Sequence, residues 1–433
     1  MTLPRPHDKT SRALLLAALG LHGVGCGGDD ESAAVEPPCY ESQALTTAEL
    51  CDLLPLACPT PSATPPVLSE AVTVAPSDAL PDGVVSQRAH NNLDVVWHAG
   101  RLFFAFRTGP SHFADPQVVL YVVSTADLRS WVLETVIQLD KDLREPRFLT
   151  LGDQLLMYFA RLGEITLTFN PEAMMMVEQQ AGCRWTEPVE VSPLGQEGFI
   201  PWRAREVDGA GLLMGYVGGA DIYELTSEGI QVYWLRTTDG HTFEPVVPDQ
   251  PVVLEGGVSE TDWAMLDDGS VVAVSRNEAG DADGWGSKIC TAPASDLGRW
   301  TCEPDRKKYD SPLLFRHRDE VYLVGRRQVA NDGYFDLEMR ELSQEEQSLE
   351  YQAEYWSTPK RCALWRVDPT TRAVEYLLDL PSNGDTCFAS TVALSDTQHL
   401  IFNYTSPLDD PELPWNDGQW GETYIYRTTL TLP

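Results

Sequence analysis

The chain has 433 residues, of which 43% are hydrophobic and 9% aromatic, so it holds ample material for a buried core. Its formal net charge is −34, and so large an excess of negative charge repels phosphate backbones and anionic lipid. Composition therefore argues against nucleic acid as a partner, whereas length alone allows two or three domains.

Residues 1–25 predict an export signal. Arg5, Lys9 and Arg12 form a basic region, and the apolar run ALLLAALGLHGVG follows it. The run is too short for a membrane-spanning helix. The tetrapeptide GVGC at residues 23–26 resembles a bacterial lipoprotein cleavage box, which implies lipidation of Cys26 and anchoring in the cell envelope, with the outer membrane as the expected site. The alternative is an ordinary secretory signal, with release of a secreted protein.

Residues 26–85 are rich in Pro, Ala and Thr and predict a flexible tether with a small Cys-containing segment. A short helix is expected within it at 46–54, with Thr47 as a plausible N-cap.

Residues 86–433 are dominated by a repeated design. Each of six segments opens with a polar cluster, runs as an apolar strand, turns at a Gly/Asp-type tip and returns as a second apolar strand. The segments span residues 91–107, 144–161, 202–216, 260–276, 310–326 and 385–404. Regular repetition on this scale is typical of blades built around an axis. We therefore predict an all-β fold, a six-bladed β-propeller, with the opening clusters gathered near the axis.

Two stretches interrupt the strand pattern and predict helices. They are PEAMMMVEQQ (171–180), with Pro at a helix-start position, and the acidic SQEEQSLEYQAEYWS (343–357). Three other stretches, 124–131, 237–243 and 294–300, each combine an Asp with a tight turn and an aromatic residue. An Asp can hydrogen-bond its own backbone two residues on, so we expect these Asp residues to be structural.

Nine cysteines minus Cys26 leave eight, an even number that suits an exported protein with disulfides. Cys290 and Cys302, and likewise Cys362 and Cys387, are placed to link adjacent strands. The remaining four, in an order that the sequence leaves open, would pair among themselves: Cys39, Cys51, Cys58 and Cys183. No CxxC pair occurs, which argues against a Cys-based zinc site, and we expect no metal or other cofactor.

The opening clusters bring carboxylates together with arginines. Two carboxylic acids can share the work of protonating a leaving oxygen and supporting an anomeric centre, while arginines bind a sugar carboxylate through paired N–H donors. The alternative is mutual neutralisation, in which Arg–Glu pairs hold blade to blade. Besides the residues assigned below, the clusters supply Arg144, Arg203, Trp202 and Trp263 as candidate substrate-binding residues.

Several stretches resemble, in the same order, segments of bacterial sialidase-like propeller proteins over about residues 88–430. The most specific is LPSNGDTCFAS (380–390), and the others include KDLREPRF (141–148), SETDWAMLDDGSVVAVSRNE (259–278) and YDSPLLFRHRDEVYLVGRR (309–327). The resemblance implies a six-bladed sialidase fold and an exo-glycosidase that acts on an anionic glycan.

The resemblance also implies site residues. Arg107, Arg276 and Arg326 are the candidates for an arginine triad, and Glu260 matches the glutamate of the family. Asp94 or Asp385 would serve as acid/base, and Tyr404 is the candidate nucleophile. We expect the protein to be a monomer whose partners are a glycan or glycoconjugate and, through its lipid, the envelope membrane.

Two other interpretations stay open. One is a non-catalytic carbohydrate- or protein-binding propeller, which needs only aromatic residues such as Trp97, Trp202, Trp263 and Trp285 at a rim. The other is a five-bladed glycosidase or lyase that uses three carboxylates.

Overall fold

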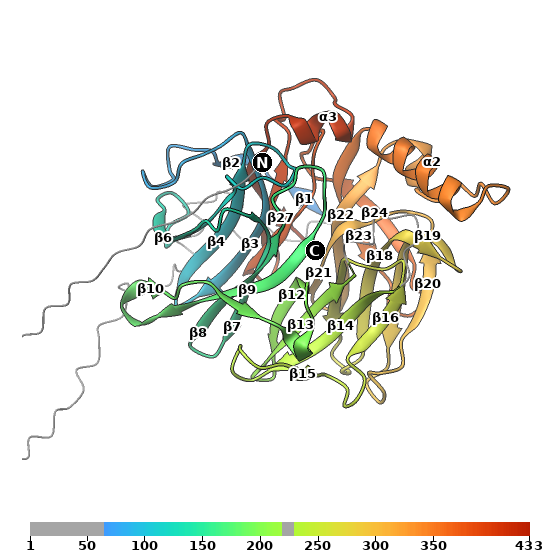
Figure 1. Cartoon of the computed structure of the whole chain (residues 1–433), viewed down its shortest axis with the longest axis horizontal. Helices are drawn as coiled ribbons and strands as arrows, with labels where there is room; N and C mark the ends of the chain where they lie inside the picture. Colours follow the sequence, from blue (N-terminus) through green and yellow to red (C-terminus); the bar gives the residue numbers. More distant parts are fainter. Residues whose placement is uncertain (1–64, 219–228) are drawn as a thin grey trace, which may run out of the picture. The chain divides into compact units, whose positions relative to one another are not determined.

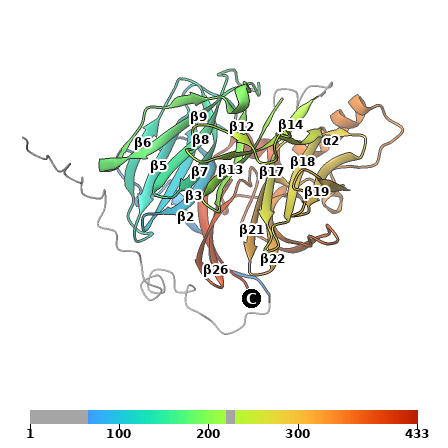
Figure 2. The ribbon, with the colours of Figure 1, turned by 90° about the horizontal axis from the view of Figure 1, so that it is seen from below.

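The structure, a computed structural model, describes residues 65–218 and 229–433. Six β-sheets of four or five strands follow one another along the chain and form the six blades of a propeller (Figures 1 and 2). The predicted six-bladed, all-β fold is therefore confirmed, and the five-bladed alternative is wrong. Cys26, Cys39, Cys51, Cys58 and the helix expected at 46–54 lie outside the described residues.

Each of the first five blades is an antiparallel meander, in which consecutive strands pair, except that β11 and β16 pair with β9 and β14. Blade one contains β3 (Ala89–His98), β4 (Arg101–Gly109), β5 (Val119–Thr125) and β6 (Val132–Ile137). Blade two contains β7 (Asp142–Leu151), β8 (Gln154–Leu162) and β9 (Pro171–Gln180), with β10 (Arg184–Trp185) and β11 (Val189–Val191) paired to β9. Blade three contains β12 (Ile200–Val207), β13 (Ala210–Val217) and β14 (Ile230–Thr237), with β15 (Glu244–Pro245) and β16 (Val252–Gly256) paired to β14.

Blade four contains β17 (Thr261–Met265), β18 (Val271–Asp281), β19 (Gly284–Ala292) and β20 (Thr301–Asp305). Blade five contains β21 (Asp310–His317), β22 (Glu320–Gln328), β23 (Lys360–Val367) and β24 (Val374–Asp379). The helix α2 (Gln344–Ser357) lies between β22 and β23 in sequence.

Blade six combines both ends of the described chain. It contains β25 (Ser390–Ser395), β26 (Gln398–Thr405) and β27 (Tyr424–Thr431), and β1 (Val67–Leu68) and β2 (Val72–Ala75) both pair with β27. The ring closes where β25 and β26 contact β3 of blade one. Residues that precede position 86, where we expected the propeller to begin, thus supply the outer edge of its last blade.

The cores between adjacent blades are apolar. One cluster joins blades one and two around Phe103, Leu120 and Phe159, and another joins blades four and five around Val274, Leu323 and Trp365. Because each strand presents side chains to both neighbouring blades, the strands read as near-continuous apolar runs.

The stretch 171–180, predicted as a helix, is strand β9. Its three consecutive methionines are all buried, because β9 pairs with β8 on one edge and with β11 on the other while both faces meet neighbouring blades. Burial on two faces outweighs the good helix propensity of methionine.

The second predicted helix is confirmed as α2. Ser343 caps it, accepting from the Glu346 N–H while the Glu346 carboxylate accepts from the Ser343 N–H, as in a capping box. Its buried residues Tyr351 and Tyr355 pack with Phe335 and with Trp415, the first residue of α3 (Trp415–Trp420). The two helices lie side by side (Figure 1).

Two disulfides are as predicted: Cys290–Cys302 links β19 to β20, and Cys362–Cys387 links β23 to the segment before β25. Two of the three Asp turns are also confirmed. Asp127 accepts hydrogen bonds from the N–H groups of Arg129 and Ser130, and Asp239 accepts from those of His241 and Thr242.

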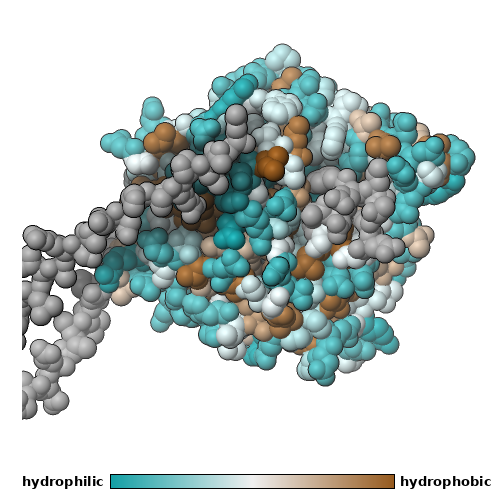
Figure 3. Space-filling model, viewed as in Figure 1, coloured by the Kyte–Doolittle hydropathy of each residue, from teal (hydrophilic) through white to brown (hydrophobic). Residues whose placement is uncertain are grey.

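On the face shown in Figure 3, hydrophilic residues predominate and apolar ones are scattered among them. No helix within the described ranges is long and apolar enough to cross a membrane.

Candidate functional site

The innermost strands of three blades carry a proline-marked bulge at the end where they begin. The register of β7 shifts between Arg144 and Arg147, that of β12 between Pro201 and Arg203, and that of β21 between Asp310 and Leu313. Proline cannot donate to a ladder, so in sheets it sits at edges or bulges. Here the prolines are Pro146, Pro201 and Pro312.

Two residues that precede these prolines have a left-handed backbone, Glu145 with φ 54° and Ser311 with φ 51°, and Asn92 in the bulge of β3 has φ 40°. Non-glycine residues rarely adopt this conformation, and they gather at functional sites. A bulge also re-aims a side chain. We use the name axial cluster for six polar side chains that lie at the openings of inner strands or on the strands paired with them: Glu145, Glu260, Arg276, Asp310, Arg326 and Asp385.

A plug of three side chains and one backbone carbonyl lies beside the axial cluster. The Trp202 indole of blade three donates to the Pro312 carbonyl of blade five at 3.3 Å and meets Phe388 of blade six edge-on. The Arg147 guanidinium of blade two stacks on both rings, 4.8 Å from the Trp202 centroid and 4.4 Å from the Phe388 centroid. Groups from four blades meet only near the axis, so the plug fills it.

Glu145 is a buried carboxyl of the axial cluster with a raised pKa. Burial raises its pKa to about 7; the positive charge of Arg147 opposes this rise, and the negative charge of Glu260 adds to it. Its Oε2 atom makes no hydrogen bond among the described residues, and its ion pair with Arg147 spans 3.7 Å.

Glu260 lies in a different environment. Burial raises its pKa too, against the charge of Arg276 and the hydrogen bond from the Ser311 N–H. That N–H donates to Oε2 at 2.7 Å, and Arg276 Nη1 lies 3.2 Å from Oε1. Arg276 also contacts Glu278 at 3.0 Å. Glu260 therefore accepts from donors that favour its ionised form. Glu145 has no such hydrogen-bond donors in the described part of the chain.

Arg326 joins blade five to blade six. It donates to the Thr386 carbonyl, forms an ion pair with Asp310 at 3.1 Å and stacks on the Trp415 ring of α3. Asp310 also accepts from the Tyr355 hydroxyl of α2 at 2.8 Å. The two helices thus position the arginine.

Asp385 is fully buried and hydrogen-bonds to His112. Its Oδ1 accepts from the Tyr404 hydroxyl and the Trp415 indole, each at 3.0 Å, and its Oδ2 lies 2.8 Å from His112 Nδ1. Although burial opposes ionisation, His112 and Tyr404 hold the pKa of Asp385 below its ordinary value. Burial lowers the pKa of His112, so the ring is neutral at pH 7, with its Nδ1 proton directed at Asp385.

The imidazole of His112 faces outward from this bond. Its side chain is 16% exposed, and its Nε2 makes no hydrogen bond with any described residue. The loop that carries His112 is fixed by two arginines. Arg107 donates to the carbonyls of Ser111 and Phe113, and Arg144 donates to the backbone carbonyl of His112 at 2.7 Å.

Tyr404 does not contact Glu260, with which a family nucleophile would pair; its partner is Asp385. Burial and the charge of Asp385 raise its pKa well above the ordinary value, which is the opposite of activation. Arg107 is 0% exposed and binds Asp142 through Nε and Nη2 at 3.0 and 2.8 Å. Arg144 donates to the other oxygen of Asp142. These contacts make Arg107 part of the framework.

Asp94 and Arg203 lie in a belt that joins blades. Asp94 accepts from the Phe148 N–H of blade two and the Ser390 hydroxyl of blade six at 2.8 and 2.6 Å, and it lies 3.6 Å from Arg203. Arg203 in turn binds Asp262 of blade four at 3.0 Å. This is the blade-to-blade neutralisation that the sequence left open.

The two tryptophans expected to bind substrate are core residues. Trp202 and Trp263 are each 1% exposed; Trp202 belongs to the plug, and Trp263 packs on Trp234 at 5.5 Å between ring centroids. Trp285 is also buried. These three tryptophans therefore do not form an exposed rim, because their side chains are packed inside the protein.

Glu145 and His112 are the functional candidates that the sequence assignment missed. The signal for Glu145 is the proline that follows it inside an apolar strand. His112 has no comparable signal, because its partner is 273 residues away. In the described part of the chain, no group of three or more His, Cys, Asp or Glu side chains is arranged to hold a metal ion.

Neither a protein-family model nor a curated protein sequence matches the chain. Among solved structures, a protein of unknown function from Dyadobacter fermentans aligns with a TM-score of 0.59 at 16% identity, over 86% of this chain and 100% of that one. Trypanosoma rangeli sialidase, in complex with the inhibitor DANA, aligns with a TM-score of 0.53 at 11% identity, over 79% of this chain and 55% of that one. The chain thus spans about half the length of that sialidase, and identities this low show a shared fold alone.

Proposed function

We propose that the protein is a glycoside hydrolase whose chemistry takes place at the axial cluster. The observation that carries this proposal is the pair Glu145 and Glu260, two buried carboxyls whose environments differ. Glu145 lacks hydrogen-bond donors and has a pKa raised to about 7, whereas Glu260 accepts from a backbone N–H and an arginine. Carboxyls set apart in this way divide into an acid and a base.

In this proposal Glu145 is the general acid. At neutral pH a large share of it stays protonated, so it can deliver a proton to the leaving glycosidic oxygen. Glu260, whose ionised form the Ser311 N–H and Arg276 favour against the effect of burial, acts as nucleophile or as the base that activates water. His112, neutral and oriented by Asp385, accepts a hydrogen bond from a sugar hydroxyl through Nε2.

We further propose that the substrate is an anionic glycan attacked at a chain end. Arg276 and Arg326 lie beside the two carboxyls and suit a sugar carboxylate. The plug of Trp202, Arg147 and Phe388 fills the axis, so a glycan approaches from one end only and cannot thread through. The sialidase assignment itself has less support, because Tyr404 and Arg107 have the framework contacts described above.

A panel of fluorogenic glycosides, including sialosides and uronides, tests the proposal. Glu145→Gln and Glu260→Gln should each reduce kcat/KM at least about 100-fold on any substrate found, in line with the size of general acid–base effects. Glu197→Gln, at an exposed glutamate, is the matched control. A rate unchanged in Glu145→Gln would overturn the assignment of the acid.

The second candidate is a non-catalytic glycan-binding propeller. The observation that favours it is the pairing of Arg276 and Arg326 with carboxylates of their own blades. If it is correct, no glycoside in the panel is cleaved, whereas glycan arrays still report binding that depends on these arginines.

We also propose that Cys26 is lipidated and tethers the propeller to the cell envelope. The order of a basic region, an apolar run and GVGC supports this proposal.

A further inference from the structure

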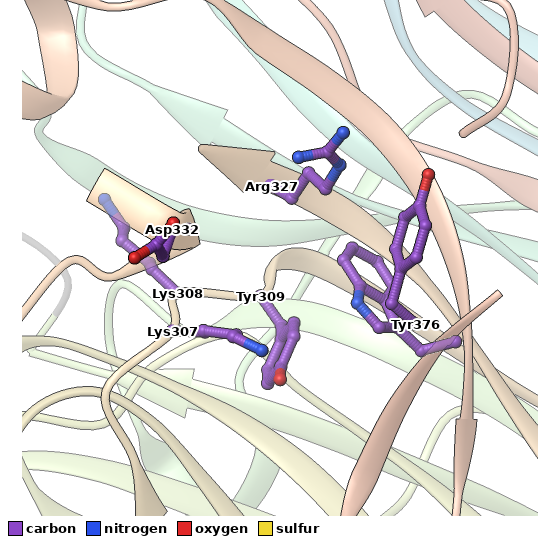
Figure 4. Close-up of a pocket in the computed structure, with 8 residues that line it drawn as sticks. Lys307, Lys308, Tyr309, Arg327, Asp332 and Tyr376 are labelled. Carbon is purple, nitrogen blue, oxygen red and sulfur yellow. The ribbon is translucent and has the colours of Figure 1, made fainter. Parts of the chain in front are cut away.

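A cavity of about 200 Å³ lies in blade five (Figure 4). Its walls come from the connection that leads into β21, from the end of β22, and from β23 and β24. Its lining includes Lys307, Tyr309, Arg327, Asp332, Trp365 and Tyr376.

Lys307 differs from the other described lysines because its ammonium makes no ion pair or hydrogen bond with a described residue. The other lysines of the described chain are bound: Lys141, Lys288 and Lys308 form ion pairs with carboxylates, and Lys360 donates to backbone carbonyls. Lys307 has no carboxylate partner for its ammonium among the described residues, and its Nζ atom lies 5.9 Å from the centroid of the Tyr334 ring. In a chain of net charge −34, an unpaired ammonium at a cavity is well placed to hold an anion.

A second donor is unused. Trp365 is 2% exposed, and its indole N–H makes no hydrogen bond with any described residue. Because Trp365 lines the cavity, a ligand oxygen there could accept from this N–H. The ring itself is fixed, because Tyr309 packs on it edge-on with centroids 5.1 Å apart.

The remaining wall is a preformed aromatic surface. Tyr376 is 48% exposed, and Arg327 stacks on its ring at 5.2 Å. Arg327 is held in turn by two bonds of 2.6 Å to Asp379. An exposed tyrosine fixed in this way offers a flat apolar face to the C–H face of a sugar ring. Figure 4 shows Tyr376 and Lys307 on different sides of the cavity.

We propose that this cavity is a second binding site, and that it takes one carboxylate-bearing sugar residue. Lys307 binds the carboxylate, the Trp365 N–H binds a ring oxygen or hydroxyl, and Tyr376 packs against the ring. Asp332, the one carboxylate among the lining residues, is exposed, and its negative charge disfavours a more highly charged ligand such as a phosphate. The site needs no catalysis, and it stands whether or not the axial cluster is an active site.

The test is a titration of the purified protein, lacking its export signal, with glucuronate, glucose and acetate, followed by ligand-observed NMR. We expect millimolar binding of glucuronate and binding at least about tenfold weaker for glucose and acetate, because each lacks one of the two recognised features. Lys307→Met should weaken glucuronate binding about tenfold or more, whereas Lys141→Met, at a paired surface lysine, should not. Trp365→Phe, which keeps the ring and removes the N–H, should weaken it as well.

Two outcomes would overturn the proposal. If acetate or glucose binds as tightly as glucuronate, the site does not recognise a carboxylated sugar. If Arg276→Met abolishes binding and Lys307→Met does not, the ligand binds at the axial cluster instead. Glycosidase activity is measured separately on the same variants, and its loss or absence bears only on the proposed function.

Discussion

The raised pKa of Glu145 predicts how stability depends on pH. Below pH 4.5, the ordinary value for a glutamate, both the folded and the unfolded chain hold the proton. As pH rises from 4.5 to about 7, the unfolded chain releases it while the folded chain retains it, so the wild type loses stability. Above about pH 7 the folded chain ionises as well, and the loss is complete.

The size of the loss follows from the two pKa values. A separation of about 2.5 pH units corresponds to about 3 kcal/mol at 1.36 kcal/mol per unit. Glu145→Gln keeps the shape of the protonated acid and cannot ionise. It should therefore match the wild type at pH 4 and exceed it by about 3 kcal/mol at pH 8. With an unfolding entropy of about 2.1 cal/mol/K per residue over about 370 residues, this corresponds to about 4 °C in Tm.

The assay is thermal unfolding of wild type, Glu145→Gln and the control Glu197→Gln between pH 4 and pH 8.5. The difference in Tm between Glu145→Gln and wild type should grow with pH, whereas the control should show no such trend. A constant difference, or a Glu145→Gln variant less stable than wild type at pH 8, would refute the reasoning. It would mean that the ion pair with Arg147 outweighs the cost of burying the charge.

Three further predictions concern substitutions of single residues. Tyr404→Phe should retain activity within about tenfold, since it removes one hydrogen bond to Asp385; a loss beyond about 1,000-fold on any substrate found would restore Tyr404 as nucleophile. Arg107→Met should lower the free energy of unfolding by about 3–5 kcal/mol in urea denaturation, because Asp142 loses a buried partner; a change below about 1 kcal/mol would contradict a framework role. Cys26→Ala should move the protein from the membrane to the soluble fraction of the cells that produce it, and persistence in the membrane would argue against the lipid tether.

The repeat made the fold predictable, because each blade buries both faces and so repeats the same apolar pattern. The disulfides and α2 were predictable for local reasons: neighbouring strands in one case and a capping box in the other. Strand β9 was not predictable, because its three methionines suit a helix in isolation and only burial against the neighbouring blades makes the segment a strand. The strands β1 and β2 were missed because their partner, β27, lies at the other end of the chain.

The axial cluster was predictable in part. Glu260, Arg276, Arg326 and Asp385 could be placed near the axis because they open or end inner strands. The direction in which each side chain points could not be predicted, since a bulge shifts the alternation of faces by one residue. That is why Trp202 proved to be part of the plug, and why Glu145, which precedes Pro146, turned out to be a buried acid beside Glu260.

The protonation of Glu145 links the two properties that we propose for the axial cluster. Its nearest cation is Arg147, 3.7 Å away and buried in the plug; protonation of Glu145 removes one of the negative charges near that guanidinium, while those of Asp94 and Asp262 remain. The state that can donate a proton is thus also the state in which the site carries one fewer negative charge. An anionic glycan would be drawn in by the same state that can cleave it, and ionisation of Glu145 would weaken both binding and proton donation. The pH limit of activity toward an anionic substrate should therefore be steeper than that toward a neutral one, because only the former loses binding and catalysis together.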